Sequence, residues 1–310
     1  MKYQNPEQFQ KFKKHLKQWA HQEEIVFVIG SERSGTSLMF QQVCQASNFY
    51  DLAEATVETF CFAKPWLLLE KASDENYEMR RYLGDAEQFR TFQQSIIPLV
   101  ERNLSIDSTV LNYEYDDYKT TNKIWYERRY KHVLRAYFYH VSQNSGLKRL
   151  VEKTPAHIRY ANRIIEAFPK AKLLVTKRSH AEVIASHRKR YQKEIALGKS
   201  ASDPSLSWLN KPIEEYINYL NGIDRKINSL LKQYPEQTKV INYNDLSQEP
   251  DITLRGIEVF LGENLTSKVA KIARADQAWD PLLNKPPTKN TIDVNNFLTR
   301  DELALLFKFN

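Results

Sequence analysis

Cysteine, glycine and proline are all scarce in this chain of 310 residues. The two cysteines, Cys44 and Cys61, are too few for a disulfide framework or a cysteine-based metal cluster, and free thiols are typical of the reducing cytoplasm. Glycine (8) and proline (12) together make up 20 of the 310 residues. Because both interrupt regular structure, their scarcity favours long helices and argues against an all-β sandwich, a collagen-like chain or a flexible linker.

Long hydrophobic runs are also missing. No apolar run approaches the roughly 18 residues that a membrane-spanning helix needs, and residues 1–21 lack the apolar core of a signal peptide. We therefore expect a cytoplasmic protein that does not enter a membrane. The composition, 42% hydrophobic and 27% charged, is that of a folded chain, and we expect a single domain over residues 1–310.

The chain is basic, with a net charge of +7, which indicates an anionic partner. Its lysines and arginines form separate groups, over residues 11–17, 119–135 and 177–193, and not one unbroken stripe. The sequence contains no zinc-finger spacing and no ribonucleoprotein aromatic motif. These features favour a small phosphate-bearing molecule over nucleic acid. The sequence indicates no particular oligomeric state.

Alternating strands and helices predict an α/β fold with three layers and a mostly parallel central sheet. Residues 25–29 are an uninterrupted β-rich apolar run, typical of a strand buried on both faces, and further strands are expected at 172–176 and 240–243. Helices are expected over residues 5–22, 36–46, 155–168, 181–195, 213–231 and 252–261. The domain then consists of an N-terminal helix (1–22), a helical insertion (56–147) and a C-terminal loop and helix (276–310) around this core.

A loop bounded by glycines follows the first predicted strand and leads into a helix. It reads Gly30-Ser31-Glu32-Arg33-Ser34-Gly35-Thr36-Ser37, with the glycine spacing of a nucleotide-binding P-loop. Backbone amides and a helix N-terminus bind phosphate at such a place. Thr36 stands where a nucleoside triphosphatase needs lysine, and the cation of this loop is Arg33. The fold is thus P-loop-like, and a nucleotide-binding protein or a kinase is the alternative function.

Three other segments carry polar residues beside predicted strands. Arg178 follows the second strand, and Ser186 lies eight residues later, so both can reach one phosphate. Glu152-Lys153-Thr154-Pro155 precedes the helix before that strand. Tyr243-Asn244-Asp245-Leu246 continues the third strand.

In this order, the motifs resemble those of the sulfotransferases that use 3′-phosphoadenosine 5′-phosphosulfate (PAPS), most of all the bacterial branch related to tyrosylprotein sulfotransferases. The resemblance covers about residues 25–261, with Ser37 and Asn244 in place of the family's threonine and glutamate. It implies that Arg178 and Ser186 hold the 3′-phosphate and that Tyr243 lies near the nucleotide. It also implies a 5′-phosphosulfate site made of Arg33, Ser34, Gly35, Thr36 and Ser37.

The implied reaction leaves 3′,5′-adenosine bisphosphate as product and sulfates a hydroxyl or amine of a small-molecule acceptor. Sulfuryl transfer, like phosphoryl transfer, depends mostly on positioning and charge stabilisation. We expect Arg33 and Lys153 to supply the positive charge, so that no metal is needed. The general base in the tyrosylprotein branch is a glutamate, and Glu54 falls at about that place, with Glu58 as its rival. The neighbouring His157 and His187 are expected to be structural.

The acceptor region, within residues 56–147, contains one unusual segment. Residues 113–118 interleave three tyrosines with Glu114, Asp116 and Asp117. Because carboxylates pair with cations and aromatic rings stack on them, we predict that these acids bind a cationic acceptor, such as an amine-bearing metabolite. A solvated loop is the simpler interpretation, and a tyrosylprotein or carbohydrate acceptor is a further alternative.

Overall fold

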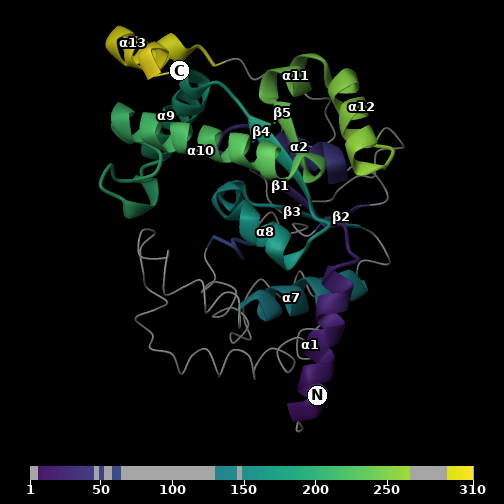
Figure 1. The fold of residues 1–310 in the computed structure, drawn as a ribbon. Coiled ribbons are helices and arrows are strands. Elements are labelled where there is room, and N and C mark those ends of the chain that lie inside the picture. The colour runs from purple at the N-terminus through teal and green to yellow at the C-terminus, as the bar shows by residue number, and fades with distance from the viewer. Residues whose placement is uncertain are drawn as a thin grey trace.

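The computed structural model describes residues 6–44, 49–51, 58–63, 130–144, 149–265 and 292–309. Its centre is a five-stranded sheet in the order β2-β3-β1-β4-β5, and every pairing in it is parallel (Figure 1). The strands are Val26–Gly30 (β1), Phe49–Asp51 (β2), Arg149–Lys153 (β3), Lys172–Lys177 (β4) and Thr238–Asn242 (β5). The predicted parallel α/β sheet is confirmed.

The central strand is β1, and all five of its residues are buried. A strand whose residues are all apolar buries its side chains only when both faces of the sheet are covered. This explains why β1 lies at the centre of the sheet, between two other strands. Three strands were predicted to within two residues of their ends. Two were missed, because β2 has only three residues and β3 (Arg149-Leu150-Val151-Glu152-Lys153) has only two apolar ones.

Helices cover both faces of the sheet. Phe27 and Val175 face a core formed with α1, α7, α8 and α10, whereas Val28 and Leu174 face α2, α11 and α12 on the other side (Figure 1). The bounds of the first group are Pro6–Ala20 (α1), Lys131–Asn144 (α7), Ala161–Ala167 (α8) and Ile213–Gln233 (α10). Those of the second are Thr36–Cys44 (α2), Tyr243–Gln248 (α11) and Pro250–Leu261 (α12). The three-layer prediction is therefore confirmed.

One predicted helix is only partly correct. Pro155 opens a 3₁₀ helix, Pro155–Tyr160 (η4), and α8 begins only at Ala161. Proline suits the first turn of either kind of helix, so the sequence signal located the start but not the type. Shorter 3₁₀ turns occur at Pro204–Leu206 (η5), Pro235–Gln237 (η6) and Val294–Asn296 (η8).

Within the predicted insertion, the structure describes residues 58–63 and 130–144, which include α7, and 58–63 is a turn without helix. Both Cys44 and Cys61 are buried free thiols, as expected. No helix in the described part of the chain is long and apolar enough to cross a bilayer.

The chain end packs beside α9 (His180–Ala196). The C-terminal helix, Arg300–Phe309 (α13), lies at the far end of the molecule from α1 (Figure 1). Arg188 donates to both carboxylate oxygens of Glu302, at 2.9 and 2.6 Å, and to the carbonyl oxygen of Phe297 at 2.7 Å. These hydrogen bonds with Arg188 lower the pKa of Glu302 to about 2, although burial opposes the shift.

A pH-dependent loss of stability follows from this ion pair. The folded pKa of Glu302 is depressed, so its contribution is present above the unfolded value near 4.5 and is lost as the pH falls toward 2. We expect Glu302→Gln to lower the free energy of unfolding by about 1–2 kcal/mol at pH 7, allowing for solvent screening. Urea denaturation at several pH values measures this difference.

The control is Asp301→Asn, which removes an exposed carboxylate from the same turn of α13. It should change the stability by less than about 0.5 kcal/mol, as for most surface substitutions. A gap between Glu302→Gln and the wild-type protein that stayed constant from pH 7 to pH 3 would contradict the assignment.

Candidate functional site

The predicted motifs converge at one edge of the sheet. In the parallel register, Gly30 pairs with Thr176, Val28 with Lys153, and Lys177 with Asn242. The carboxyl ends of β1, β3, β4 and β5 therefore lie side by side. Ligands of open parallel sheets bind outside the carboxyl ends of the strands. They bind at the point where the chain connections on the two sides of the first strand run in opposite directions.

The loop between β1 and α2 makes a tight turn against β4. A Cβ atom on Gly30 would lie 2.6 Å from the Thr176 carbonyl oxygen, so the backbone approaches β4 as closely as a glycine permits. Ser34 donates to the Ser31 carbonyl oxygen and shares a hydrogen bond with the Thr176 hydroxyl, both at 2.7 Å. Ser34 is fully buried, so its hydroxyl shapes the loop. Arg33 has a φ of 68°, an uncommon left-handed conformation for a side chain of this size.

The two predicted phosphate motifs meet directly at Arg33. Its Nε atom donates to the Ser186 hydroxyl on α9 at 3.0 Å, across 153 residues of sequence. Loss of solvent lowers the pKa of Arg33, and the positive charges of Arg190 and Arg178 lower it further. Guanidinium groups that repel one another in this way favour a bound anion, since negative charge relieves the repulsion.

Arg33, Arg178 and Arg190 form a cationic cluster, and Tyr243 contacts Arg178 within it. The Arg178 guanidinium lies 4.2 Å from the centre of the Tyr243 ring, which is a cation–π contact. Arg178 Nη2 also lies 3.3 Å from a carboxylate oxygen of Glu182. A Cβ atom on Gly35 would lie 2.5 Å from the Tyr243 ring. Tyr243 thus packs between the loop and Arg178 and fixes both.

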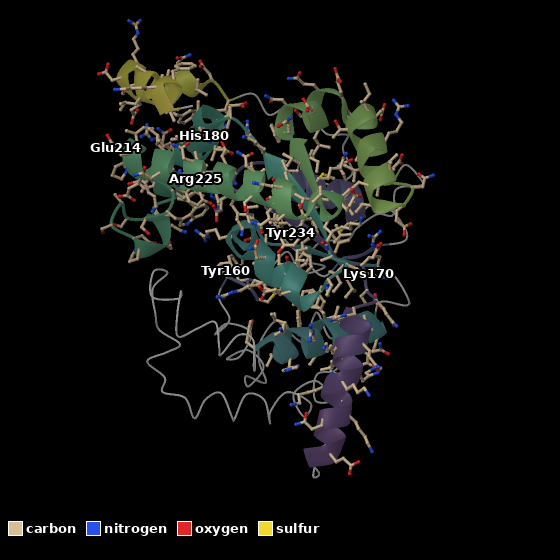
Figure 2. The ribbon with its side chains drawn as sticks, viewed as in Figure 1. Tyr160, Lys170, His180, Glu214, Arg225 and Tyr234 are labelled. Carbon is tan, nitrogen blue, oxygen red and sulfur yellow. The ribbon has the colours of Figure 1, made fainter. Side chains whose placement is uncertain are left out.

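A carboxylate on α10 supports the junction between β4 and α9. Asp224 accepts from Lys177 at 3.0 Å and lies 3.2 Å from the ring nitrogen of His180. His180 is the first residue of α9 and is labelled in Figure 2. Burial raises the pKa of Asp224, but the hydrogen bonds with His180 and Lys177 outweigh burial and lower it. Because Lys177 and His180 flank Arg178 in the sequence, this cluster holds the backbone on both sides of it.

Lys153, at the end of β3, is paired with a residue from the turn at 58–63. Its Nζ atom lies 2.7 Å from Glu58 Oε1. The preceding residue, Glu152, is buried and accepts from the hydroxyls of Thr59 at 2.7 Å and Thr154 at 2.6 Å. Glu152 also contacts His157 Nδ1 at 3.1 Å. Burial raises the pKa of Glu152, but His157 and these hydrogen bonds outweigh burial and lower it.

Both candidate histidines are buried, which supports the structural role expected for them. His157 Nε2 accepts from the Phe62 amide at 3.1 Å. The His187 ring meets Trp208 and Tyr216 edge to face, and burial lowers the pKa of His187 to about 4. A His187 side chain without charge at neutral pH suits an apolar contact on α9.

The remaining predicted residues divide into two groups. Thr36 and Ser37 form the first turn of α2, at the position expected for phosphate-binding amides, and Thr36 is buried. The predicted base and the predicted acceptor acids, Glu54, Glu114, Asp116 and Asp117, lie outside the described residues.

Sequence reasoning missed Arg190. It lies one helical turn after Ser186 on the same helix, and its charge acts on Arg33. The four-residue spacing from Ser186 was a usable signal, but Arg190 stood in a run of basic residues that looked like a solvated helix face. No group of three or more acidic, histidine or cysteine side chains is arranged to hold a metal among the residues that the structure describes.

The contact between Gly35 and Tyr243 can be tested by adding a methyl group. Gly35 has a φ of 100° and Gly198 has a φ of 92°, but a Cβ on Gly198 would meet nothing within 4 Å. Alanine at either position carries about 1 kcal/mol of backbone strain. Steric overlap with Tyr243 should make Gly35→Ala less stable than Gly198→Ala by about 1–3 kcal/mol in urea denaturation. Equal losses in the two variants would show that Tyr243 does not pack tightly on the loop.

A solved sulfotransferase shares this fold. Sulfotransferase STF9 from Mycobacterium avium is 15% identical, with a TM-score of 0.51 over 97% of this chain and 80% of that one. The sulfotransferase from Alicyclobacillus acidocaldarius is 14% identical, with a TM-score of 0.48 over 93% of this chain and 92% of that one. At such identities, the likeness to STF9 supports the fold alone.

No curated protein sequence matches this chain. The sequence profile of the Sulfotransferase family, in contrast, matches residues 25–267, which are 243 of the 310 residues. The matched span contains the loop after β1, the end of β3, the junction of β4 with α9 and the start of α11. The chain therefore belongs to the sulfotransferase family.

Proposed function

We propose that this sulfotransferase moves a sulfuryl group from PAPS to a hydroxyl or amine of a small-molecule acceptor. The observation that carries the proposal is the direct contact between the two predicted phosphate motifs, where Arg33 Nε lies 3.0 Å from Ser186 Oγ. A donor with phosphate at both its 3′ and 5′ positions needs two anion-binding elements that lie side by side. A nucleoside triphosphate would need a loop lysine and offers no 3′-phosphate to Ser186.

Each part of the donor has a matching group. The 3′-phosphate binds Arg178 and Ser186, with Arg190 adding positive charge from the next turn of α9. The 5′-phosphate binds the loop and the N-terminus of α2, which begins at Thr36. Tyr243 aligns Arg178 with the loop, since its ring contacts both.

The reaction is an in-line displacement at sulfur. The acceptor oxygen or nitrogen forms a bond to sulfur while the bond from sulfur to the bridging oxygen breaks. The electron pair of the broken bond stays on the departing 5′-phosphate, giving 3′,5′-adenosine bisphosphate. Arg33 and Lys153 stabilise the charge on the bridging and sulfuryl oxygens, as cations do in phosphoryl transfer, so the proposed reaction uses no metal.

The acceptor's proton goes to a carboxylate, for which we retain Glu54. Both described ends of the segment that contains it lie near the sheet edge, because Asp51 pairs with Val151 in β3 and Glu58 contacts Lys153. The buried His157 and His187 offer no exposed ring nitrogen to an acceptor. On the acceptor side, a cation-binding role for Glu114, Asp116 and Asp117 stays a prediction, as does the nearer relationship to tyrosylprotein sulfotransferases.

The donor assignment predicts that Arg178→Ala weakens binding of 3′,5′-adenosine bisphosphate by about 10- to 150-fold, the range for one lost charge-assisted hydrogen bond. ADP has no 3′-phosphate, so its weaker binding should be unchanged by Arg178→Ala. Titration calorimetry with both nucleotides measures these effects. The matched control is Lys193→Ala, which removes an exposed positive charge from α9. If the wild-type protein bound ADP as tightly as the bisphosphate, the 3′-phosphate site would be wrong.

The base assignment predicts that Glu54→Gln lowers turnover by about 10²- to 10⁴-fold, since the amide keeps the size of the side chain but accepts no proton. Donor affinity should stay within about twofold, because Glu54 is not assigned to the donor site. Transfer from labelled PAPS, first with the wild-type protein to find an acceptor and then with the variant, measures the effect. Turnover of Glu54→Gln at the wild-type rate would exclude Glu54 as the base.

A further inference from the structure

Lys153 forms an ion pair with Glu58, and the proposed reaction does not account for this carboxylate. Lys153 Nζ and Glu58 Oε1 are 2.7 Å apart, although the two residues are separated by 95 positions in the sequence. The Lys153 side chain is only 6% exposed, whereas that of Glu58 is 25% exposed. An ammonium so far removed from water needs an anionic or hydrogen-bonding partner, and Glu58 provides one.

Glu58 is held in place by a buried hydrogen-bond network. The next residue, Thr59, donates to Glu152 at 2.7 Å, and the Phe62 amide donates to His157 at 3.1 Å. Glu152 contacts His157 in turn, so the turn at residues 58–63 is fixed to β3 and η4 at two points. Glu152 and Lys153 are adjacent on β3, and Thr59 and Glu58 are adjacent on the turn. The hydrogen bond between Thr59 and Glu152 therefore positions Glu58 beside Lys153.

A second carboxylate, Glu182, pairs with a cation of the proposed 3′-phosphate site, as Glu58 pairs with Lys153. Glu182 lies 3.3 Å from Arg178, which is assigned to the 3′-phosphate. Glu58 lies beside Lys153, which is assigned to the sulfuryl group. Donor and product both carry the 3′-phosphate, but only the donor carries the sulfuryl group. The two carboxylates should therefore affect the two nucleotides differently.

We propose that Glu58 is the counter-ion of Lys153 in the donor-free protein and sets how tightly the donor binds relative to the product. The inference rests on the proposed function, because it assigns Lys153 to the sulfuryl group. A carboxylate beside Lys153 repels the incoming sulfuryl oxygens and competes with them for the ammonium. Glu58 thereby weakens binding of the donor ground state, and strong ground-state binding alone does not raise the turnover number.

Titration calorimetry without acceptor tests this role, with PAPS and 3′,5′-adenosine bisphosphate as probes. We expect Glu58→Gln to tighten PAPS binding by about 3- to 10-fold and to change bisphosphate binding by less than about twofold, since a unit charge a few ångströms away in a partly wet site has an effect of this size. The matched control is Glu182→Gln, which should change the affinity for both nucleotides by the same factor.

A double variant separates this role from a structural one. In a Lys153→Met background, Glu58→Gln should no longer affect PAPS binding, because the ammonium that the carboxylate pairs with is gone. Thermal unfolding of each variant checks that the fold is retained, and Glu58→Asp, which keeps the charge, should restore wild-type affinities.

Three results would overturn the inference. They are weaker PAPS binding in Glu58→Gln, equal changes for the two nucleotides, or an effect of Glu58→Gln that persists without Lys153. Failure of the proposed function looks different, because the wild-type protein would then bind neither nucleotide, and the inference would fall with it.

Discussion

The path by which the chain leaves β1 determines how the loop contacts β4, α9 and α11. The backbone at Gly30 approaches the Thr176 carbonyl so closely that a Cβ atom would overlap it at 2.6 Å. The buried hydroxyl of Ser34 then joins the loop to the Thr176 side chain. With the loop fixed against β4, Arg33 reaches Ser186 on α9, and Gly35 leaves room for the Tyr243 ring. Sites built on such rigid supports hold a ligand in one geometry.

The cations at this end of the sheet are of two kinds, those paired with a carboxylate and one that is bonded to a neutral hydroxyl. Arg33 contacts a neutral hydroxyl and lies within the field of Arg178 and Arg190, so part of the positive charge is left for an anion. Lys153 and Arg178, in contrast, each lie beside a carboxylate. Removing a partly buried cation from water is costly, and a nearby carboxylate lowers this cost until an anionic ligand binds. In the proposed donor site, the acids thus stabilise these two cations, although they oppose an anionic ligand.

The sequence was most informative where one local signal sufficed. The apolar run at residues 25–29, the glycine spacing of the loop and the pair Arg178 and Ser186 each lie within about ten residues, and together they predicted the sheet, its loop and the cationic edge. β3 was missed because Glu152 and Lys153 occupy positions where a typical central strand is apolar. The contact of Lys153 with Glu58 spans 95 positions, and no local pattern encodes it.

The burial of both histidines near the site limits which residue can accept a proton. His157 is bonded on both ring nitrogens, to Glu152 and to the Phe62 amide, and His187 packs between Trp208 and Tyr216. Each ring stabilises a part of the fold that carries site residues, so neither can turn toward an acceptor without breaking that support. Under the proposed function, the proton then goes to a carboxylate near the ends of β2 and β3. Glu58 is paired with Lys153, which agrees with the proposal that Glu54 is the base.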